Sequence, residues 1–150
     1  MAAGEGKNAV FLAELRFDVE AVDISKVALD HTRKFAREKR VKIRTIPADL
    51  NSFPIEQGKY DLVIDFYFLN RRLIPRIKKG LKPGGLVVFE TYTTEQTSLG
   101  TAGPHTPRYL LKSNELLKRF AGFRVLFYRE GIFRENGRRK AVASLIAQKI

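Results

Sequence analysis

The sequence predicts an α/β fold with a mostly parallel sheet and one antiparallel strand near the C-terminus. Short apolar segments alternate with longer helical ones along the 150 residues. The segment Tyr60–Phe66 (YDLVIDF) is almost wholly apolar, which is typical of a strand buried on both faces. Two apolar segments near the end, Phe123–Tyr128 and Ala141–Ala147, are joined by a turn around Glu135–Gly137 and predict a closing hairpin.

The remaining elements follow the same alternation. A glycine-rich turn opens the chain, and a helix with apolar residues at 9, 10, 12, 13 and 15 follows it. Ser25 is expected to cap the next helix, and Pro75 to lie in the first turn of a later basic helix or to kink it. In chain order we expect a strand at Phe17–Asp23, a helix at Ser25–Lys39, a strand at Val41–Ile46, a helix at Leu69–Leu81, a turn at Lys82–Gly85, a strand at Leu86–Tyr92, a loop at Thr93–Arg108 and a helix from Ser113 or Asn114 that ends near Gly122.

Composition excludes several classes of protein. The length and the 44% apolar content suit one domain with one hydrophobic core. No apolar run approaches the roughly 18 residues of a membrane-spanning helix, and the N-terminus lacks the pattern of a signal peptide. The absence of cysteine excludes disulfides, thiolate metal sites and cysteine nucleophiles. It also fits a cytoplasmic location, and no metal site is expected.

The formal net charge of +12 has two interpretations. It is either the charged surface of a heat-adapted protein or a footprint for RNA or DNA. No RNA-binding aromatic signature and no zinc motif accompany the charge, so nucleic acid stays open as a partner.

Three motifs carry chemistry, and the first is Gly4-Glu5-Gly6-Lys7-Asn8-Ala9. It has the form G-x-G-x-x-A directly before a helix. Its glycines permit a tight turn and let a ligand approach the backbone, while the helix N-terminus offers free N–H groups. A purely structural turn is the alternative.

Two carboxylates follow at the ends of successive strands. Asp23 lies 17 residues after Gly6, where it can accept hydrogen bonds from both hydroxyls of a ribose. Asp49 ends the next strand and can accept from the amine of an adenine, while the Leu50 N–H donates to the ring. A helix N-cap and an Asx turn are the respective alternatives. Because ligands bind at the carboxyl ends of parallel strands, the three motifs together predict an adenosine site.

These motifs resemble, in order, those of class I S-adenosylmethionine-dependent methyltransferases. Within that superfamily the chain is most similar to the tellurite-resistance (TehB-like) branch of small-molecule methyltransferases. The resemblance covers nearly the whole chain, is specific for the superfamily and is weak for the substrate. It rests on residues 2–9, Val22–Ser25, Ala48–Leu50, Tyr60–Val63 and Leu81–Gly85, and for the branch on Arg108–Leu111, Glu115–Leu117 and Ala143–Ala147.

The resemblance implies a Rossmann-like class I methyltransferase sheet, with S-adenosylmethionine as the cofactor. The cofactor contacts that it implies are Gly4, Glu5 and Gly6 at the methionine part, Asp23 at the ribose, Ile24 against the adenine, Asp49 and Leu50 at the adenine edge, and Phe66 near the sulfonium or the substrate. Core packing is the alternative for Phe66.

The implied reaction transfers a methyl group to a small-molecule acceptor by in-line displacement, which depends largely on proximity and alignment. A hydroxyl or amine acceptor would need a base. His105 and Tyr109 are candidates because their loop follows a strand on the ligand side, and a solvated loop residue is the alternative. The alternatives are an RNA methyltransferase, a nicotinamide-dependent oxidoreductase and an inactive truncated scaffold.

One departure from the family concerns the N-terminus. The family has a strand directly before the glycine turn, whereas only Met1–Ala3 precede Gly4. That strand would be central, and each buried backbone group left unpaired costs roughly 1–3 kcal/mol. We therefore expect a longer natural N-terminus, strand exchange within a homodimer, or direct pairing of the flanking strands. A weakened or absent cofactor site is expected in the 150-residue form.

Overall fold

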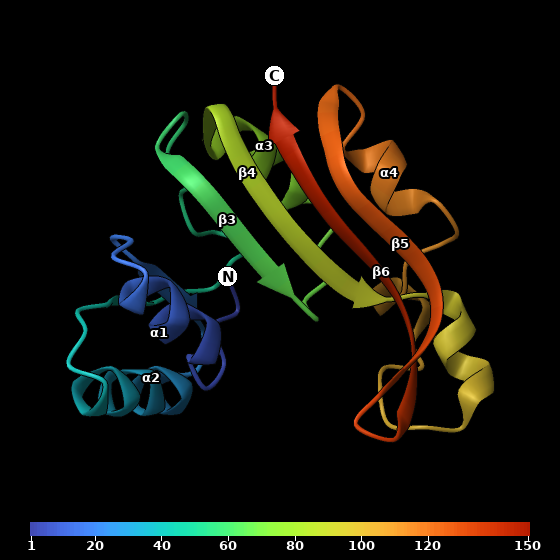
Figure 1. Ribbon diagram of the computed structural model, residues 1–150, viewed down its shortest axis with the longest axis horizontal. Helices are drawn as coiled ribbons and strands as arrows, with labels where there is room; N and C mark the ends of the chain where they lie inside the picture. The colour runs from blue at the N-terminus through green and yellow to red at the C-terminus, as the bar shows by residue number, and fades with distance from the viewer. The chain divides into compact units, whose positions relative to one another are not determined.

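The computed structural model describes residues 1–150, which form two compact units, residues 1–54 and residues 55–150. The first unit holds a two-stranded parallel sheet with two helices, and the second holds a four-stranded mixed sheet with two α-helices (Figure 1). None of the helices is both long enough and apolar enough to span a bilayer.

The first unit begins with the glycine turn and continues as two strand–helix alternations. Its elements are α1 (Lys7–Glu14), β1 (Glu20–Asp23), α2 (Lys26–Glu38) and β2 (Arg44–Pro47). β1 and β2 run parallel, with Asp23 opposite Pro47. The Ser25 hydroxyl accepts from the N–H of Ala28 at 3.2 Å, so the predicted cap of α2 is confirmed.

Both strands of the first unit start three residues later than predicted. The N–H of Phe17 donates to the carbonyl of Leu12 at 3.1 Å, and that of Val41 donates to Ala36 at 3.0 Å. These bonds close the C-terminal ends of α1 and α2, where the last carbonyls of a helix need donors. Phe17 and Val41 therefore complete the preceding helices instead of opening strands.

The second unit has one sheet in the order β3-β4-β6-β5. β3 and β4 are parallel, and β6 runs antiparallel to both β4 and β5. The prediction of one antiparallel strand near the C-terminus is thus confirmed. The elements are β3 (Tyr60–Phe66), α3 (Ile74–Gly80), β4 (Leu81–Tyr92), the 3-10 helices η1 (Thr94–Leu99) and η2 (Pro107–Tyr109), α4 (Glu115–Arg119), β5 (Phe123–Glu135) and β6 (Arg138–Lys149).

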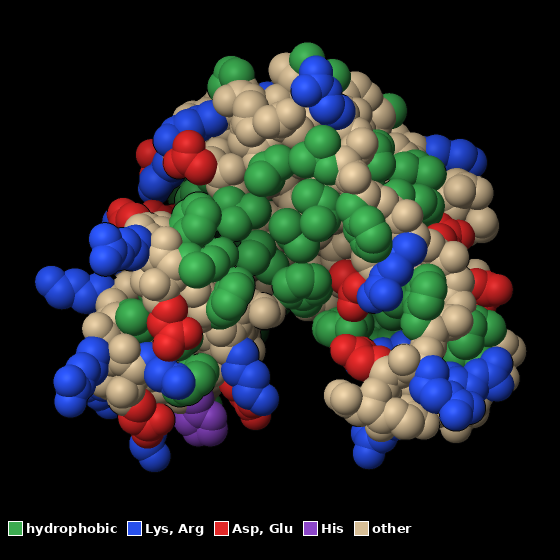
Figure 2. Space-filling model, viewed as in Figure 1, with side chains coloured by type: hydrophobic (Ala, Val, Ile, Leu, Met, Phe, Trp, Pro, Cys, Tyr) green, Lys and Arg blue, Asp and Glu red, His purple; other side chains and the backbone are tan.

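The two faces of this sheet differ. One face packs a core in which Phe89 of β4 meets Phe120 at 6.2 Å between ring centroids, with Ile77 and Leu116 fully buried around it. The other face carries the half-buried Val88, whose cross-strand neighbours also have apolar side chains. Figure 2 shows hydrophobic side chains gathered over this face.

The turns of the second unit lie where the sequence predicted them, with one exception. Asn136 and Gly137 both have positive φ, +48° and +76°, as a two-residue hairpin turn of type I′ requires. Pro75 lies in the first turn of α3, as predicted. The segment Lys82–Gly85, in contrast, does not separate two elements. Leu81 and Leu86 both pair with β3, so this segment bulges from within β4.

The two helices of this unit are shorter than predicted. Asn114 precedes α4 as expected, but its side chain makes no capping bond. Its N–H instead donates to the carboxylate of Glu130 on β5 at 3.0 Å. A tertiary contact therefore fixes the start of α4.

Candidate functional site

The glycine turn is built by backbone conformations that favour glycine. Gly4 and Gly6 have φ of +53° and +80°, and the N–H of Gly6 donates to the Ala3 carbonyl at 3.0 Å. Gly6 then caps the start of α1. The turn therefore presents its backbone at the N-terminus of α1, as the G-x-G-x-x-A pattern predicted.

The two glycines have different surroundings. A Cβ on Gly6 would lie 2.4 Å from Oγ1 of Thr32, a fully buried α2 residue whose hydroxyl donates to the carbonyl of Ala28 at 3.1 Å. Gly6 is thus required by the close approach of α2 to the turn. A Cβ on Gly4 would have nothing within 4 Å. Only Gly4 therefore leaves space for a ligand against the backbone.

Asp23 faces the glycine turn. Its Oδ2 accepts from the N–H of Gly4 at 3.0 Å, and its Oδ1 accepts from the N–H of Ser25 at 2.8 Å. Each carboxylate oxygen has a second lone pair, so hydroxyl groups can still donate to it. Ile24, the next residue, is 73% exposed and offers an apolar surface beside the carboxylate.

Asp49 lies close to the end of the neighbouring strand. The N–H of Ala48 donates to the Asp23 carbonyl at 3.0 Å, which draws the carboxyl ends of β1 and β2 together. Oδ1 of Asp49 accepts from the backbone and side-chain nitrogens of Asn51, both at 2.8 Å, so the Asx turn is present. Oδ2 accepts no hydrogen bond and remains available. The side chain of Leu50 is buried.

Two further predicted site residues are Glu5 in the first unit and Phe66 in the second unit. Glu5 is exposed and forms an ion pair with Lys7 at 3.3 Å, although it stands between the two glycines. Phe66, in the second unit, ends β3 opposite Glu90.

The two candidate bases also lie in the second unit. His105 and Tyr109 are exposed in the loop between β4 and α4. Tyr109 lies under the guanidinium of Arg108 at 4.5 Å from its ring centroid. No carboxylate orients either side chain.

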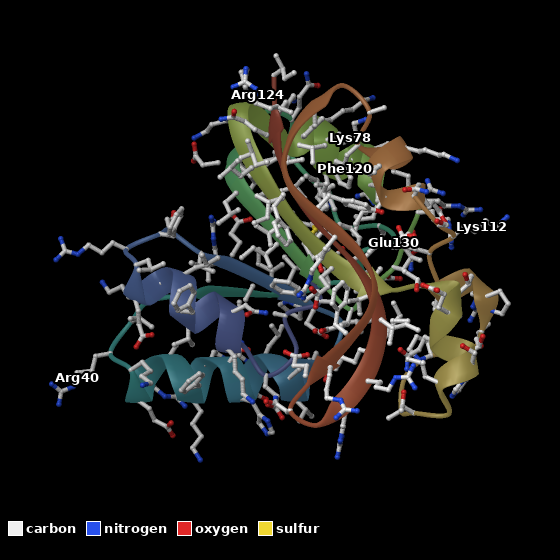
Figure 3. The ribbon with its side chains drawn as sticks, turned by 45° about the vertical axis from the view of Figure 1, so that its right-hand side comes forward. Arg40, Lys78, Lys112, Phe120, Arg124 and Glu130 are labelled. Atoms are coloured by element: carbon white, nitrogen blue, oxygen red, sulfur yellow. The ribbon has the colours of Figure 1, made fainter.

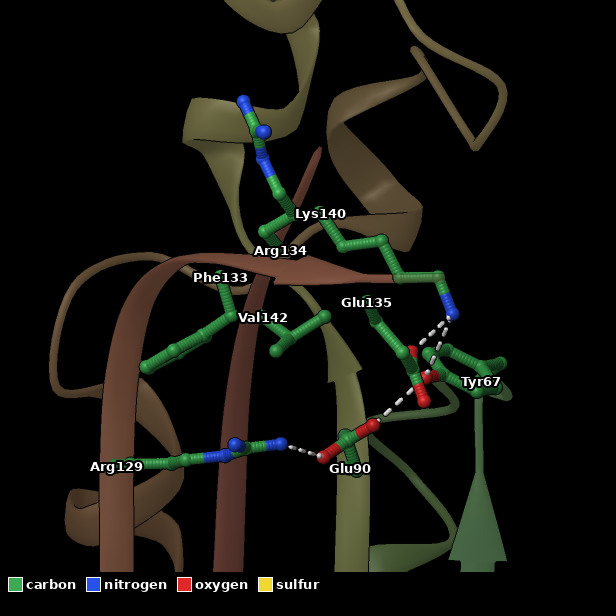
Figure 4. Close-up of a pocket in the computed structure, with 8 residues that line it drawn as sticks. All are labelled: Tyr67, Glu90, Arg129, Phe133, Arg134, Glu135, Lys140 and Val142. Atoms are coloured by element: carbon green, nitrogen blue, oxygen red, sulfur yellow. Dashed lines mark hydrogen bonds and ion pairs between the residues drawn. The ribbon is translucent and has the colours of Figure 1, made fainter. Parts of the chain in front are cut away.

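A recess in the second unit holds polar residues that the sequence did not single out (Figure 4). It encloses about 130 Å³ beside the carboxyl ends of β3 and β4, the edge where open α/β sheets bind ligands. A signal was present in the sequence, because Glu90 is the one acid in the apolar strand LVVFETY. The recess is lined by Tyr67, Glu90, Arg129, Phe133, Arg134, Glu135, Lys140 and Val142.

Glu90 is the centre of this recess. It accepts from the hydroxyl of Tyr67 at 2.7 Å, from Ser144 at 2.5 Å and from Arg129 at 3.2 Å. Burial opposes its ionisation, but hydrogen bonds from these three groups lower its pKa. Burial, together with Glu90, raises the pKa of Tyr67 to about 12. At neutral pH the recess thus combines a neutral phenol with a carboxylate.

Tyr67 reaches Glu90 from a strained backbone conformation. Its φ is +59°, a region that residues other than glycine seldom occupy. Such conformations cost on the order of 1–3 kcal/mol and cluster at ligand sites. Its N–H also donates to the Glu90 carbonyl at 2.7 Å, so both ends of Tyr67 are fixed on Glu90. The recess is therefore a preformed polar site for a small group.

Comparison with known proteins points to one family. The family model described as a methyltransferase domain matches residues 1–85. Hemagglutinin 1 of Eikenella corrodens is 28% identical over 142 residues, which cover 88% of this chain and 45% of that protein.

Solved structures agree on the fold. TehB from Haemophilus influenzae superposes with a TM-score of 0.82 at 22% identity, covering 99% of this chain and 55% of that one. A SAM-dependent methyltransferase from Methanosarcina mazei gives a TM-score of 0.76 at 17% identity, covering 99% of this chain and 89% of that one. The chain spans about half the length of Hemagglutinin 1 and of TehB.

The order of the motifs, the sheet with its one antiparallel strand and the matched model agree. The predicted Rossmann-like class I methyltransferase fold is confirmed, and TehB is among the solved structures that share it. The family model covers more than half of the chain. The chain therefore belongs to the family of methyltransferase domains.

Proposed function

We propose that this chain forms part of an S-adenosylmethionine-dependent methyltransferase that methylates a small-molecule acceptor by in-line displacement. The observation that carries the proposal is the hydrogen bond from Gly4 to Asp23, which joins the glycine turn to the carboxylate at the end of the next strand. The cofactor-binding residues are Gly4, Glu5, Gly6, Asp23, Ile24, Asp49 and Leu50, with Phe66 in the second unit.

The first unit offers a matching group for each part of the cofactor. The free lone pairs of Asp23 suit the ribose hydroxyls, and exposed Ile24 suits one face of the adenine. Oδ2 of Asp49 can accept from the exocyclic amine, and the open space at Gly4 admits the methionine part. The bound cofactor supplies a methyl group already activated on a sulfonium, so the chain's own task is binding and alignment.

A small acceptor is favoured by the recess around Glu90. Its volume of about 130 Å³ suits a small polar group. The Glu90 carboxylate and the Tyr67 phenol can orient a hydroxyl or amine there. Glu90 and Tyr67 are hydrogen-bonded to each other, so they are better placed than His105 and Tyr109 to orient the acceptor.

We also propose that a further strand completes the free edge of β1, so that both units form one methyltransferase domain. The N–H of Ala3 donates to the Val22 carbonyl at 3.1 Å, which places the residues before the glycine turn alongside β1. β1 and β3 belong to different sheets. The strand can come from residues upstream of the turn or from a second copy of the chain.

Asp23→Asn is expected to weaken binding of S-adenosylhomocysteine by about 10- to 100-fold, since hydrogen bonds to charged groups contribute about 1.5–3 kcal/mol. Asparagine keeps the size of Asp23 and one acceptor oxygen. Titration calorimetry measures the affinity. Asp18→Asn is the matched control because Asp18 is an exposed carboxylate just before β1, and it should leave the affinity unchanged. Equal binding by Asp23→Asn and the parent chain would remove the ribose assignment.

A further inference from the structure

The excess positive charge is unevenly distributed along the chain. Residues 1–54 hold 10 Lys and Arg against 8 Asp and Glu, whereas residues 55–150 hold 18 against 8. The first unit is therefore close to neutral, and the second carries nearly all of the net charge of +12. A polyanion would therefore be attracted mainly to the second unit.

Within the second unit, the turn that joins β5 and β6 is densely cationic. Residues 134–140 (RENGRRK) contain four cations and one acid. Arg134 lies directly opposite Arg139 in the strand register, and like charges in that position destabilise a strand pair. The turn sits at the lower end of the hairpin in Figure 1.

Three of the four cations lack an anionic partner. Arg134, Arg138 and Arg139 are exposed and form no ion pair. Glu135, the acid of the turn, forms an ion pair with Lys140 at 2.6 Å. Figure 4 shows Lys140 and Glu135 turned toward each other, while the guanidinium of Arg134 points away from the recess.

Other acids of the unit do not neutralise these arginines. Asp65 is buried, and Glu95 forms no ion pair. The remaining acids bond elsewhere: Glu56 with Lys59, Asp61 with Lys82, Glu90 with Arg129, Glu115 with Arg71 and Arg119, and Glu130 with Tyr128 and the N–H of Asn114. The repulsion between Arg134 and Arg139 is therefore uncompensated within the second unit.

We propose that this arginine turn, Arg134, Arg138 and Arg139, docks the phosphate backbone of single-stranded RNA. Arginine binds phosphate through paired N–H donors, and a bound polyanion would screen the Arg134–Arg139 repulsion. Side chains alternate between the two faces of a strand pair, so Arg134 and Arg139 share one face and Arg138 lies on the other. A flexible single strand can follow both faces of this narrow ribbon.

The docking goes beyond the proposed methyl transfer, because it is non-covalent and needs no cofactor. It can be tested without S-adenosylmethionine, so either proposal can fail while the other stands. The probe is a fluorescein-labelled 20-nucleotide oligouridylate, and fluorescence anisotropy gives the affinity of the full chain at several salt concentrations.

Arg139→Glu is the informative variant because it replaces a repulsive cross-strand pair with an attractive one. RNA affinity should fall at least ~10-fold, and the slope of log affinity against log salt should decrease in magnitude by about 0.7 as one phosphate contact is lost. The melting temperature should hold or rise, since opposite charges now face each other. If Arg139 had only a structural role, Arg139→Glu would lower the melting temperature and leave the RNA affinity unchanged.

Arg124→Glu is the matched control. Arg124 is exposed near the start of β5, at the other end of the hairpin from the turn (Figure 3), and forms no ion pair. Arg124→Glu changes the net charge by the same amount as Arg139→Glu and should alter the RNA affinity by no more than ~2-fold. Arg134→Gln with Arg138→Gln is a second test, expected to weaken binding without introducing an acid.

Loss of affinity confined to the turn variants supports the proposal. Four results would overturn it: no binding of the RNA by the parent chain, equal weakening by Arg139→Glu and Arg124→Glu, tighter binding of duplex DNA of the same length, or equally effective competition by polyglutamate.

Discussion

Asp65→Asn is expected to stabilise the protein by up to about 4 kcal/mol at pH 8 and to have little effect at pH 4. Asp65 lies on β3 with 1% of its surface exposed, and neither carboxylate oxygen has a hydrogen-bond partner. Burial raises its pKa from 3.8 to about 7. An unpartnered buried carboxylate is unfavourable when ionised, and asparagine carries no charge.

The pH dependence has a defined direction. Between about pH 4 and pH 7 the unfolded chain has lost the Asp65 proton while the folded chain keeps it. The folded state binds more protons there, so the free energy of unfolding falls as the pH rises through this window. Urea unfolding between pH 4 and pH 8.5 should show this fall in the parent chain and its absence in Asp65→Asn.

Asp61→Asn separates burial from simple removal of a charge. Asp61 is on the same strand but exposed, and it pairs with Lys82 at 2.7 Å. Its replacement should cost only about 0–1 kcal/mol, because exposed ion pairs contribute little. If Asp65→Asn proves less stable than the parent chain at pH 8, the carboxylate has a stabilising partner and the interpretation is wrong.

Elements with a strong local signal were predictable from the sequence. The bounds of β3 match the prediction because a mostly apolar run, interrupted only by Asp61 and Asp65, marks them. The turn at Asn136 and Gly137 follows from the positive φ that this dipeptide tolerates. Ser25 caps α2 because its side chain reaches a backbone N–H three residues ahead. All three depend on neighbours in sequence.

Boundaries fixed by contacts distant in sequence were not predictable. The segment at 82–85 bulges within β4 because Leu81 already pairs with Tyr60. A Pro-Gly-Gly sequence indicates a turn but not whether a neighbouring strand is present on both sides of it.

In the candidate site, too, the part with a local sequence signal was predictable and the part that depends on distant contacts was not. Gly4 and Asp23 come together because a glycine turn and a strand end are adjacent in this topology, which the order of the motifs along the chain predicted. The recess around Glu90 was not predictable because its members, among them Tyr67 and Arg129, come from three strands and a loop. Only the fold brings them within hydrogen-bond distance.

Gly6→Ala is expected to destabilise the protein by about 2–5 kcal/mol, combining left-handed backbone strain with overpacking. The new Cβ would approach Oγ1, Cγ2 and Cβ of Thr32 to 2.4, 2.7 and 2.8 Å. Thr32 is fully buried on α2 and cannot rotate away without losing its bond to the Ala28 carbonyl. Urea unfolding measures the loss, and Thr32→Ala in the same chain should recover part of it.

Gly4→Ala distinguishes the structural glycine from the ligand-facing one. Gly4 has the same sign of φ but no atom within 4 Å of a Cβ, so only backbone strain of about 1–2 kcal/mol is expected. Its methyl group would occupy the space proposed for the methionine part of the cofactor. Gly4→Ala should therefore impair S-adenosylhomocysteine binding, measured below the unfolding transition, more than it impairs stability.

Gly6→Ala should impair stability more than S-adenosylhomocysteine binding. If both variants lose stability equally, Thr32 does not constrain the turn; if Gly4→Ala binds normally, the cofactor does not pass over Gly4.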